Sequence, residues 1–165
     1  MKNIILIGMM GCGKTTVGRL LSKALNREQV DTDQLIEARV GCSVSQIFAL
    51  SGEEYFRGLE LEISLELAEK ENLVVSCGGG LPLRRGCADA LASSGLIFWL
   101  DRDPGETYDS LDTSGRPLAQ QGRAAFVERY QQRAPLYRAA AHHIIRADSP
   151  EQAARAILNI VEGGE

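Results

Sequence analysis

The segment of the chain that most clearly suggests chemistry is Gly8-Met9-Met10-Gly11-Cys12-Gly13-Lys14-Thr15. It matches the Walker A pattern, in which backbone amides and a helix N-terminus surround phosphate oxygens. In such a loop the lysine neutralises charge between the β- and γ-phosphates, and the hydroxyl after it ligates Mg²⁺. We therefore expect ATP and Mg²⁺, with Lys14 acting in catalysis and Thr15 on the metal. The expected nucleotide contacts are Gly11, Cys12, Gly13, Lys14, Thr15 and Thr16.

A pair of carboxylates, Asp31 and Asp33, follows the next short apolar segment. In extended backbone, residues two apart face the same side. One carboxylate could hold a water on Mg²⁺ while the other accepts the proton of a substrate hydroxyl. The alternative is that one of them only caps the next helix. Beside a phosphate-binding loop we favour the catalytic interpretation.

Three consecutive glycines, Gly78, Gly79 and Gly80, end a third apolar segment. Such a run loses chain entropy on folding, and it usually serves a close approach of backbone to a ligand. The arginines are ambiguous on their own. Arg57 and Arg133 have an ordinary surface interpretation, in which Glu53, Glu54 and Glu60 form surface ion pairs with Arg57 that contribute little. Arg116 lies in the polar stretch 112–122 and is either an exposed loop residue or a lid arginine that closes on the transferring phosphate. Cys12 is interpreted as a small loop residue, with a redox role as the alternative.

These motifs need a scaffold that brings them together, and the order of apolar segments predicts one. We expect strands at 3–7, 29–30, 73–76, 96–100 and 144–145. The helices are expected at 14–25, 33–40, 51–70, 84–92, from Pro104, at 123–141 with a kink at Pro135, and from Ser149. Strands that alternate with helices predict a three-layer α/β/α fold with a central five-stranded parallel sheet, in one domain over residues 1–165. Ligands of such sheets bind beyond the carboxyl ends of the strands, where all three motifs fall.

Composition excludes several classes of protein. The net charge is −4, so neither a nucleic-acid partner nor a membrane surface is expected. The four cysteines have no metal-ligand or disulfide-framework spacing, which favours reduced thiols in the cytoplasm. The apolar run at 4–7 is too short for a signal peptide or a membrane span. His142-His143 is expected to start a strand rather than bind a metal.

A Walker A loop alone does not distinguish kinases from GTPases or motor ATPases. The chain has no Asn-Lys-x-Asp guanine-reading motif and is short, which leaves a small P-loop kinase, nucleoside-monophosphate-kinase-like in fold. The motifs, taken in order, resemble the shikimate kinase family. The resemblance extends over nearly the whole chain and rests on Gly8–Gly18, Val30–Asp33, Gly52–Arg57, Gly78–Gly80, Arg116–Leu118 and Arg133–Tyr137.

The resemblance implies transfer of the ATP γ-phosphate to the 3-hydroxyl of shikimate, in the pathway to chorismate and aromatic amino acids. It further implies a cytosolic monomer, with a substrate-binding region at about 32–61 and a lid at about 112–122. Asp33 would orient the shikimate hydroxyls, either as a general base or as an orienting group only. Arg57 and Arg133 would clamp the carboxylate, and Gly78–Gly80 would contact the substrate, chiefly through the Gly79 amide. Asp31 would hold Mg²⁺ through water, Ser76 would help order that water, and Arg116 would close over ATP.

The chain departs from the family pattern on the nucleotide side. Family members commonly carry an arginine before the Arg-Pro-Leu motif, and residues 107–115 contain none. The segment 146–150 is where an adenine-contacting loop is expected. Two other functions stay open on the sequence: a kinase for another small acid, such as a gluconate-type kinase, and a catalytically weak nucleotide-binding protein.

Overall fold

A single parallel sheet forms the centre of the computed structural model, which describes residues 1–111 and 121–164. The strands lie in the order β2-β3-β1-β4-β5, and every neighbouring pair is parallel. They are β1 (Asn3–Ile7), β2 (Glu28–Asp31), β3 (Leu73–Ser76), β4 (Gly95–Leu100) and β5 (His143–Ile145). The prediction of five parallel strands is confirmed. All of β1 and β3 is buried, as their unbroken runs of β-branched and apolar residues indicate.

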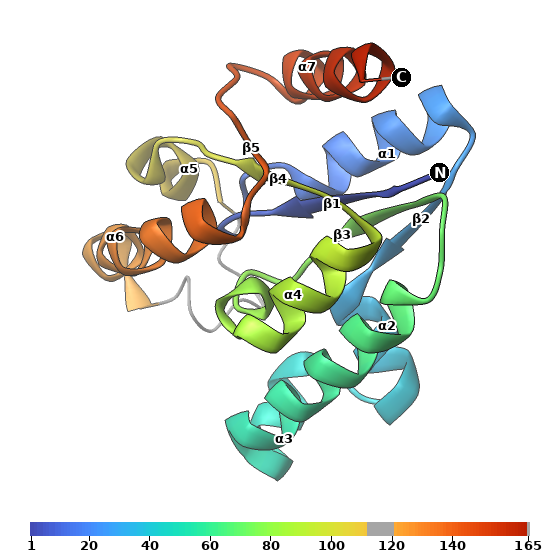
Figure 1. The fold of residues 1–165 in the computed structure, drawn as a ribbon. Helices are drawn as coiled ribbons and strands as arrows, with labels where there is room; N and C mark the ends of the chain where they lie inside the picture. Colours follow the sequence, from blue (N-terminus) through green and yellow to red (C-terminus); the bar gives the residue numbers. More distant parts are fainter. Residues whose placement is uncertain (112–120, 165) are drawn as a thin grey trace.

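Helices cover both faces of the sheet (Figure 1). Helices α1 (Lys14–Leu25) and α7 (Pro150–Gly163) pack together on one face. The other face is covered by α3 (Val44–Ala68), α4 (Arg85–Ser94) and α6 (Arg123–Ala140), and the shorter elements are α2 (Thr32–Val40), η1 (Leu81–Leu83) and α5 (Pro104–Asp109). The three-layer prediction is therefore confirmed.

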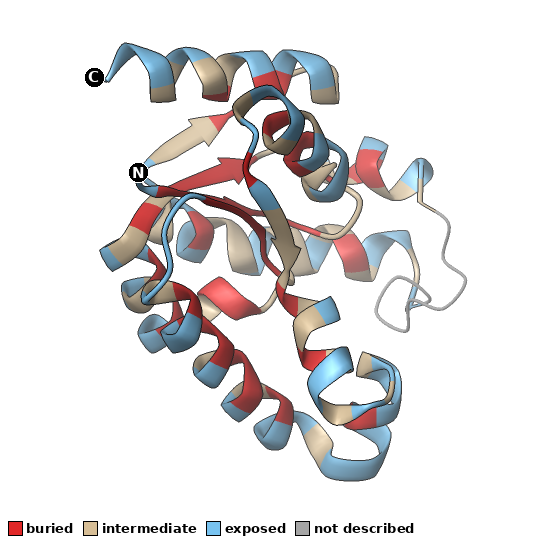
Figure 2. Cartoon of the chain, turned by 90° about the vertical axis from the view of Figure 1, so that its right-hand side faces the viewer, coloured by how far each residue is buried: buried red, intermediate tan, exposed pale blue. Residues whose placement is uncertain are grey.

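Alternate residues of the strands supply the two halves of the core. Ile4 and Leu6 pack with the α1 and α7 side, whereas Ile5 and Ile7 pack with the α3, α4 and α6 side. This is the period of two that a strand imposes, and it leaves the central strands buried from both faces in Figure 2. Two apolar clusters therefore pack against the two faces of the sheet and stabilise the edge from which the functional loops emerge.

Helix α3 consists of two helical segments that meet at a kink. A capping box between Ser43 and Gln46 begins it, as the sequence indicates. The helix then passes through Gly52, whose φ of 82° and ψ of 172° are not helical. The sequence predicts a helix that begins at Ser51, and the break at Gly52 agrees with the start of a new helical segment there. The buried side of this segment consists of Phe56, Leu59, Ile63 and Leu67.

Three loops leave the carboxyl edge of the sheet side by side. The phosphate-binding segment follows β1, residues 77–80 follow β3, and residues 101–103 follow β4. The first of these loops lies so close to the end of β4 that a Cβ at Gly8 would be 2.9 Å from the carbonyl oxygen of Leu100. Within the described part of the chain, no helix is both long and apolar enough to cross a membrane.

Candidate active site

The phosphate-binding loop between β1 and α1 has the backbone that its glycines permit. Gly11 and Gly13 have φ values of 79° and 100°, a region that favours glycine. The ammonium of Lys14 turns back over the loop, where Nζ donates to the carbonyl oxygens of Gly8 at 2.7 Å and Met9 at 3.0 Å. No side chain of the described residues caps the N-terminus of α1. Its first amides therefore remain available to an anion.

Two side chains from neighbouring strands hold the first turn of α1. Ser76 Oγ donates to the carbonyl oxygen of Lys14 at 3.1 Å, and Gln29 Nε2 donates to that of Thr15 at 3.0 Å. Gly18 makes room, because a Cβ there would lie 2.6 Å from Gln29 Nε2. Sequence reasoning gave Ser76 only a family-based role and missed Gln29, whose one signal is a polar residue in a strand.

The two carboxylates of the pair have different roles, because Asp31 caps a helix and Asp33 lies in the site. Asp31 Oδ1 accepts a hydrogen bond from the amide of Gln34 at 3.1 Å, so Asp31 is the N-cap of α2, as the alternative interpretation holds. Asp33 lies in the first turn of that helix. Burial, followed by the neighbouring charge of Asp31, raises the pKa of Asp33 to about 6, although Lys14 partly offsets this. A carboxyl with that pKa is matched to proton transfer near neutral pH.

Each of the three consecutive glycines lies against one of the predicted acceptor side chains. A Cβ at Gly78 would lie 2.5 Å from Asp33 Oδ1, and one at Gly79 would lie 3.0 Å from Arg133 Nη1. A Cβ at Gly80 would lie 2.6 Å from Arg57 Nη1. The segment 78–80 therefore gathers one carboxylate and two guanidinium groups that come from α2, α3 and α6. Any side chain at these three positions would displace them.

Arg57 is held by two glutamates, and one of them is buried. Its guanidinium hydrogen bonds to Glu60 and lies 3.4 Å from the exposed carboxylate of Glu53. Glu60 is only 1% exposed, and its Oε2 has no hydrogen-bond partner among the described residues. Burial raises the pKa of Glu60 to about 7, while Arg57 counteracts the increase. The surface interpretation of Arg57 is thus wrong for its main partner. The sequence predicted Glu60 as a partner of Arg57 but placed the pair at the surface, although the position of Glu60 next to Leu59 on the buried side of α3 indicates burial.

Two further side chains anchor the glycine segment and were also missed. Thr32 Oγ1 accepts a hydrogen bond from the amide of Gly78 at 2.8 Å. The hydroxyl of Tyr137 donates to the carbonyl oxygen of Gly79 at 2.6 Å. Both side chains are fully buried. The sequence places Tyr137 four residues after Arg133, on the same side of α6, but gives no indication of what its hydroxyl contacts.

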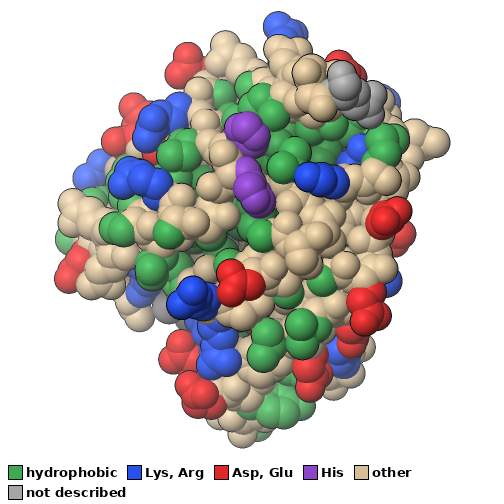
Figure 3. All heavy atoms as spheres, viewed as in Figure 1, with side chains coloured by type: hydrophobic (Ala, Val, Ile, Leu, Met, Phe, Trp, Pro, Cys, Tyr) green, Lys and Arg blue, Asp and Glu red, His purple; other side chains and the backbone are tan. Residues whose placement is uncertain are grey.

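Arg116 and most of the predicted lid cannot be placed in this arrangement, because residues 112–120 lie outside the described residues. The two histidines behave as the sequence suggests: His143 begins β5, and His142 Nδ1 accepts from the amide of Ile97 at 2.8 Å. Figure 3 shows this pair at the surface. Within residues 1–111 and 121–164, no group of three His, Cys, Asp or Glu side chains could hold a metal ion by itself.

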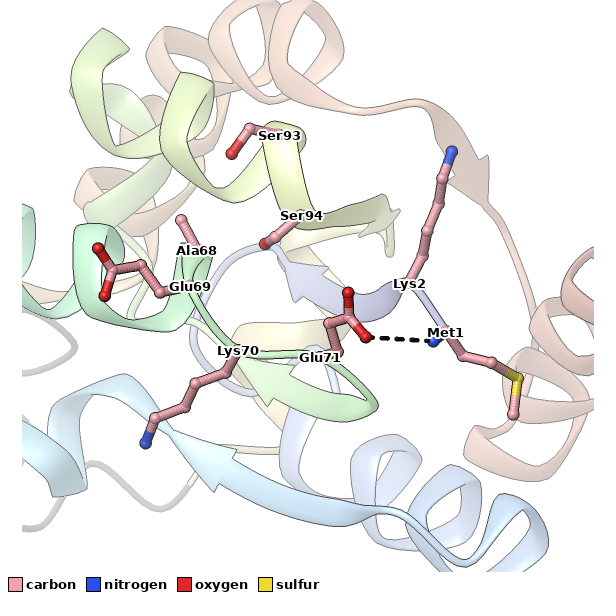
Figure 4. A pocket seen from close by; sticks show the side chains of 8 residues that line it. All are labelled: Met1, Lys2, Ala68, Glu69, Lys70, Glu71, Ser93 and Ser94. Carbon is pink, nitrogen blue, oxygen red and sulfur yellow. Dashed lines mark ion pairs between the residues drawn. The ribbon is translucent and has the colours of Figure 1, made fainter.

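Two hollows lie outside the glycine segment. One of about 380 Å³ is at the amino-terminal edge of the sheet, beside the ion pair of the Met1 amino group and Glu71 in Figure 4. It contains none of the predicted site residues and lies at the wrong end of the strands for a ligand of this fold. The second, of about 560 Å³, lies beyond β4 and β5, where Asp101 pairs with Arg146 at 3.0 Å. It adjoins the segment 146–150, in which we expected adenine contacts.

Fold and loop together define a P-loop kinase. A gluconokinase from Sinorhizobium meliloti has the same fold, with a TM-score of 0.60 at 15% identity over 98% of this chain and 94% of that one. At that identity the likeness concerns the fold alone.

The family follows from closer similarities. The model of the shikimate kinase family matches residues 10–162, and the chain belongs to that family, whose kinases phosphorylate an alcohol group. A shikimate kinase of Clostridium beijerinckii is 39% identical over 162 residues, which cover 98% of this chain and 92% of that protein. One from Symbiobacterium thermophilum is 47% identical over 119 residues, or 70% and 68% of the two chains. The structure of shikimate kinase from Acinetobacter baumannii in complex with shikimate superposes with a TM-score of 0.92 at 32% identity, covering 100% of this chain and 95% of that one.

Proposed function

We propose that this kinase transfers the γ-phosphate of ATP to the 3-hydroxyl of shikimate, giving shikimate 3-phosphate and ADP on the way to chorismate. The observation that carries the proposal is the convergence of Asp33, Arg57 and Arg133 on Gly78–Gly80. Shikimate presents a carboxylate and several hydroxyl groups. One buried carboxylate and two guanidinium groups complement it, because guanidinium pairs with carboxylate and carboxylate with hydroxyl.

In the proposed acceptor complex, Arg57 and Arg133 bind the shikimate carboxylate and Asp33 orients the 3-hydroxyl. A guanidinium has five N–H donors, so Arg57 can keep Glu60 and still bind a ligand. The Gly79 amide adds a backbone contact. Asp33 accepts the hydroxyl proton as the oxygen attacks phosphorus, for which its raised pKa suits it.

On the nucleotide side, we propose that the amides and side chains of residues 11–16 surround the phosphates. Lys14 would exchange the carbonyl oxygens of Gly8 and Met9 for phosphate oxygens, because a negative acceptor binds an ammonium more strongly. Arg116 would approach from the lid at 112–122 and neutralise charge on the transferring group. The region 32–61 and this lid would be parts of one domain spanning residues 1–165.

The residues present fit Mg²⁺. Thr15 has an exposed hydroxyl, and Asp31 has a second carboxylate oxygen beyond the one that caps α2. Mg²⁺ prefers oxygen ligands and binds through one or two protein groups together with substrate phosphates and water. Thr15 would ligate the ion directly and Asp31 through water. When bound, the ion would neutralise charge on the phosphates.

We further propose a cytoplasmic monomer that binds neither nucleic acid nor membranes. The net charge of −4 supports the absence of nucleic-acid and membrane binding, and the free cysteines of the described residues support the cytoplasm. Acidic and basic side chains are interspersed on the face in Figure 3, with no extended basic surface there.

The function is tested by measuring ADP release with Mg²⁺-ATP and shikimate, gluconate or no acceptor, with the phosphorylated product identified by ³¹P NMR. We expect strong stimulation by shikimate alone and a single phosphate ester at the 3-position. Equal ADP release with and without shikimate would refute the proposal. Stimulation by gluconate and not by shikimate would show that the acceptor is gluconate.

A further inference from the structure

The hydroxyl of Tyr137 lies where three parts of the site meet. It donates to the carbonyl oxygen of Gly79 at 2.6 Å and lies 3.8 Å from Sδ of Met9 in the phosphate-binding loop. A Cβ at Gly79 would be 3.6 Å from this hydroxyl and 3.0 Å from Arg133 Nη1. One atom of Tyr137 is therefore next to the phosphate loop, the glycine segment and an acceptor arginine.

The surroundings of Tyr137 make this hydrogen bond important. The residue is 0% exposed, so its hydroxyl cannot exchange the Gly79 carbonyl for water. Burial raises the pKa of Tyr137 to about 12, and the adjacent Arg133 partly offsets this. The hydroxyl thus stays protonated and remains a donor throughout the physiological range. Because the segment 78–80 has no side chains of its own, its conformation depends on such bonds from outside.

We propose that Tyr137 is a positioning residue of the acceptor site. Its hydroxyl fixes the Gly79 carbonyl, and so sets the direction of the Gly79 and Gly80 backbone against Arg133 and Arg57. This role rests on the proposed function, because the groups it positions are those assigned to shikimate. It predicts that loss of the hydroxyl weakens shikimate binding while ATP binding is retained.

The chain contains a matched control on the same helix. Tyr130 also lies on α6, its hydroxyl also donates at 2.6 Å, and its pKa is likewise raised to about 12, but its acceptor is Asp101, beyond β4. The rings of both tyrosines lie near Trp99, with centroids 5.7 Å away for Tyr137 and 6.4 Å for Tyr130. Removing either hydroxyl leaves a similar aromatic cluster. Only Tyr137→Phe removes a bond to the glycine segment.

The first experiment compares wild type, Tyr137→Phe and Tyr130→Phe by steady-state kinetics. For Tyr137→Phe we expect the KM for shikimate to rise about tenfold, since one buried hydrogen bond is lost and a carbonyl is left unpaired. The KM for ATP should change less than about twofold, and Tyr130→Phe should leave the shikimate KM unchanged. Equal effects of the two variants, or equal changes in both KM values for Tyr137→Phe, would overturn the proposal. Thermal melting verifies that each variant is folded.

A second experiment does not depend on activity. Deuterium exchange into a peptide spanning residues 77–83 should be faster in Tyr137→Phe than in wild type or Tyr130→Phe, because the glycine segment loses its anchor. Unchanged exchange there would contradict the proposal even if the acceptor is not shikimate. Tyr137→Phe removes only the hydroxyl oxygen and keeps the ring that packs against Trp99, so a folded variant is available for both measurements. If the wild type shows no shikimate-dependent ADP release, the proposed function is refuted. Deuterium exchange in residues 77–83 then still tests whether Tyr137 positions the glycine segment.

Discussion

The phosphate-binding loop and the acceptor site differ in how the chain builds them. The loop is one continuous segment from Gly8 to Thr15, and Lys14 bonds to carbonyl groups only five and six residues away. The acceptor site draws Asp33, Arg57 and Arg133 from three helices onto a segment of three glycines. Local sequence can encode the first arrangement, whereas only the assembled fold produces the second.

The two regions also differ in how the loss of one side chain would change the stability of the protein. Lys14 is satisfied by uncharged carbonyl oxygens and can exchange them for phosphate without leaving a buried charge behind. Arg57 is paired with Glu60, which is buried and has one oxygen without a partner among the described residues. Removing a group from the acceptor site should therefore affect stability as well as binding, whereas removing Lys14 should affect mainly the reaction.

The largest effect is expected for Lys14→Met. The substitution removes the one side-chain charge of the loop that can reach the phosphates, and we expect kcat to fall about a thousandfold with little change in melting temperature. Steady-state ADP release measures the first and calorimetry the second. Lys23→Met, at the exposed far end of the same helix, is the control and should match wild type. A kcat within about tenfold of wild type would exclude Lys14 from transition-state stabilisation.

Asp33→Asn should reduce kcat about a hundredfold, because Asn cannot accept the hydroxyl proton. In wild type, kcat/KM should fall as the pH decreases through about 6, the pKa of Asp33, and the variant should lack this limb. A pH–rate profile of both proteins makes the comparison. Asp89→Asn on the exposed side of α4 is the control. If Asp33→Asn kept the same decrease in kcat/KM at acidic pH, that decrease would belong to the titration of another group.

Asp33 also makes a prediction about stability. Its folded pKa of about 6 exceeds the ordinary aspartate pKa of 3.8, so between these values the folded state binds more protons than the unfolded state. This contribution to the free energy of unfolding decreases as pH rises from about 4 to 6 and stays low above that range. Asp33→Asn should therefore be more stable than wild type at pH 8, with the difference vanishing at pH 4. Urea unfolding at both pH values tests it, and a variant less stable at pH 8 would contradict the account.

Arg57→Ala should raise the KM for shikimate about thirtyfold and also lower the free energy of unfolding by about 2 kcal/mol, because Glu60 loses its partner. Adding Glu60→Gln should restore much of the stability but not the KM. Arg133→Ala should raise the KM as well. Chemical denaturation of wild type and these variants measures the change in stability, and shikimate titration of the same proteins measures the change in binding. Recovery of the KM in the double variant would show that Arg57 serves only to neutralise Glu60.

Gly78→Ala is expected to have the smallest effect, a decrease of about tenfold in kcat/KM, because its Cβ would contact Asp33 and displace the carboxylate. Gly58→Ala is the matched control. A Cβ at Gly58 meets no atom within 4 Å, and alanine suits the interior of α3, so the control should be as active as wild type and slightly more stable. Similar activities of the two variants would mean that the close approach at Gly78 is unimportant.

The fold was predictable because its signals are local. Buried strands read as short runs of Ile, Leu and Val, and caps such as Ser43 and Ser149 mark helix starts. The sequence did not predict η1, a single short turn over Leu81–Leu83 that has no periodic pattern of its own. The positions of Asp33, Arg57 and Gly78–Gly80 could be singled out, but the pairing of each glycine with one side chain could not.

What the sequence left out consists of contacts between distant segments. Thr32, Tyr137 and Gln29 each act through a bond whose partner is fixed only when helices dock on the sheet. Arg57 illustrates a different limit: its pairing with Glu60, three residues along α3, was predicted as a surface ion pair, whereas the burial of Glu60 was not predicted. The predicted role of Arg116 stays a prediction, since it lies outside the described residues.

The central claim is that the glycine segment and its three side chains form the acceptor site, and a crystal structure with shikimate and ADP tests it most directly. The account predicts the shikimate carboxylate within hydrogen-bonding distance of Arg57 and Arg133, and the 3-hydroxyl on Asp33 facing the phosphate-binding loop. Shikimate bound elsewhere, or with its carboxylate directed at Lys14 and away from both arginines, would contradict it.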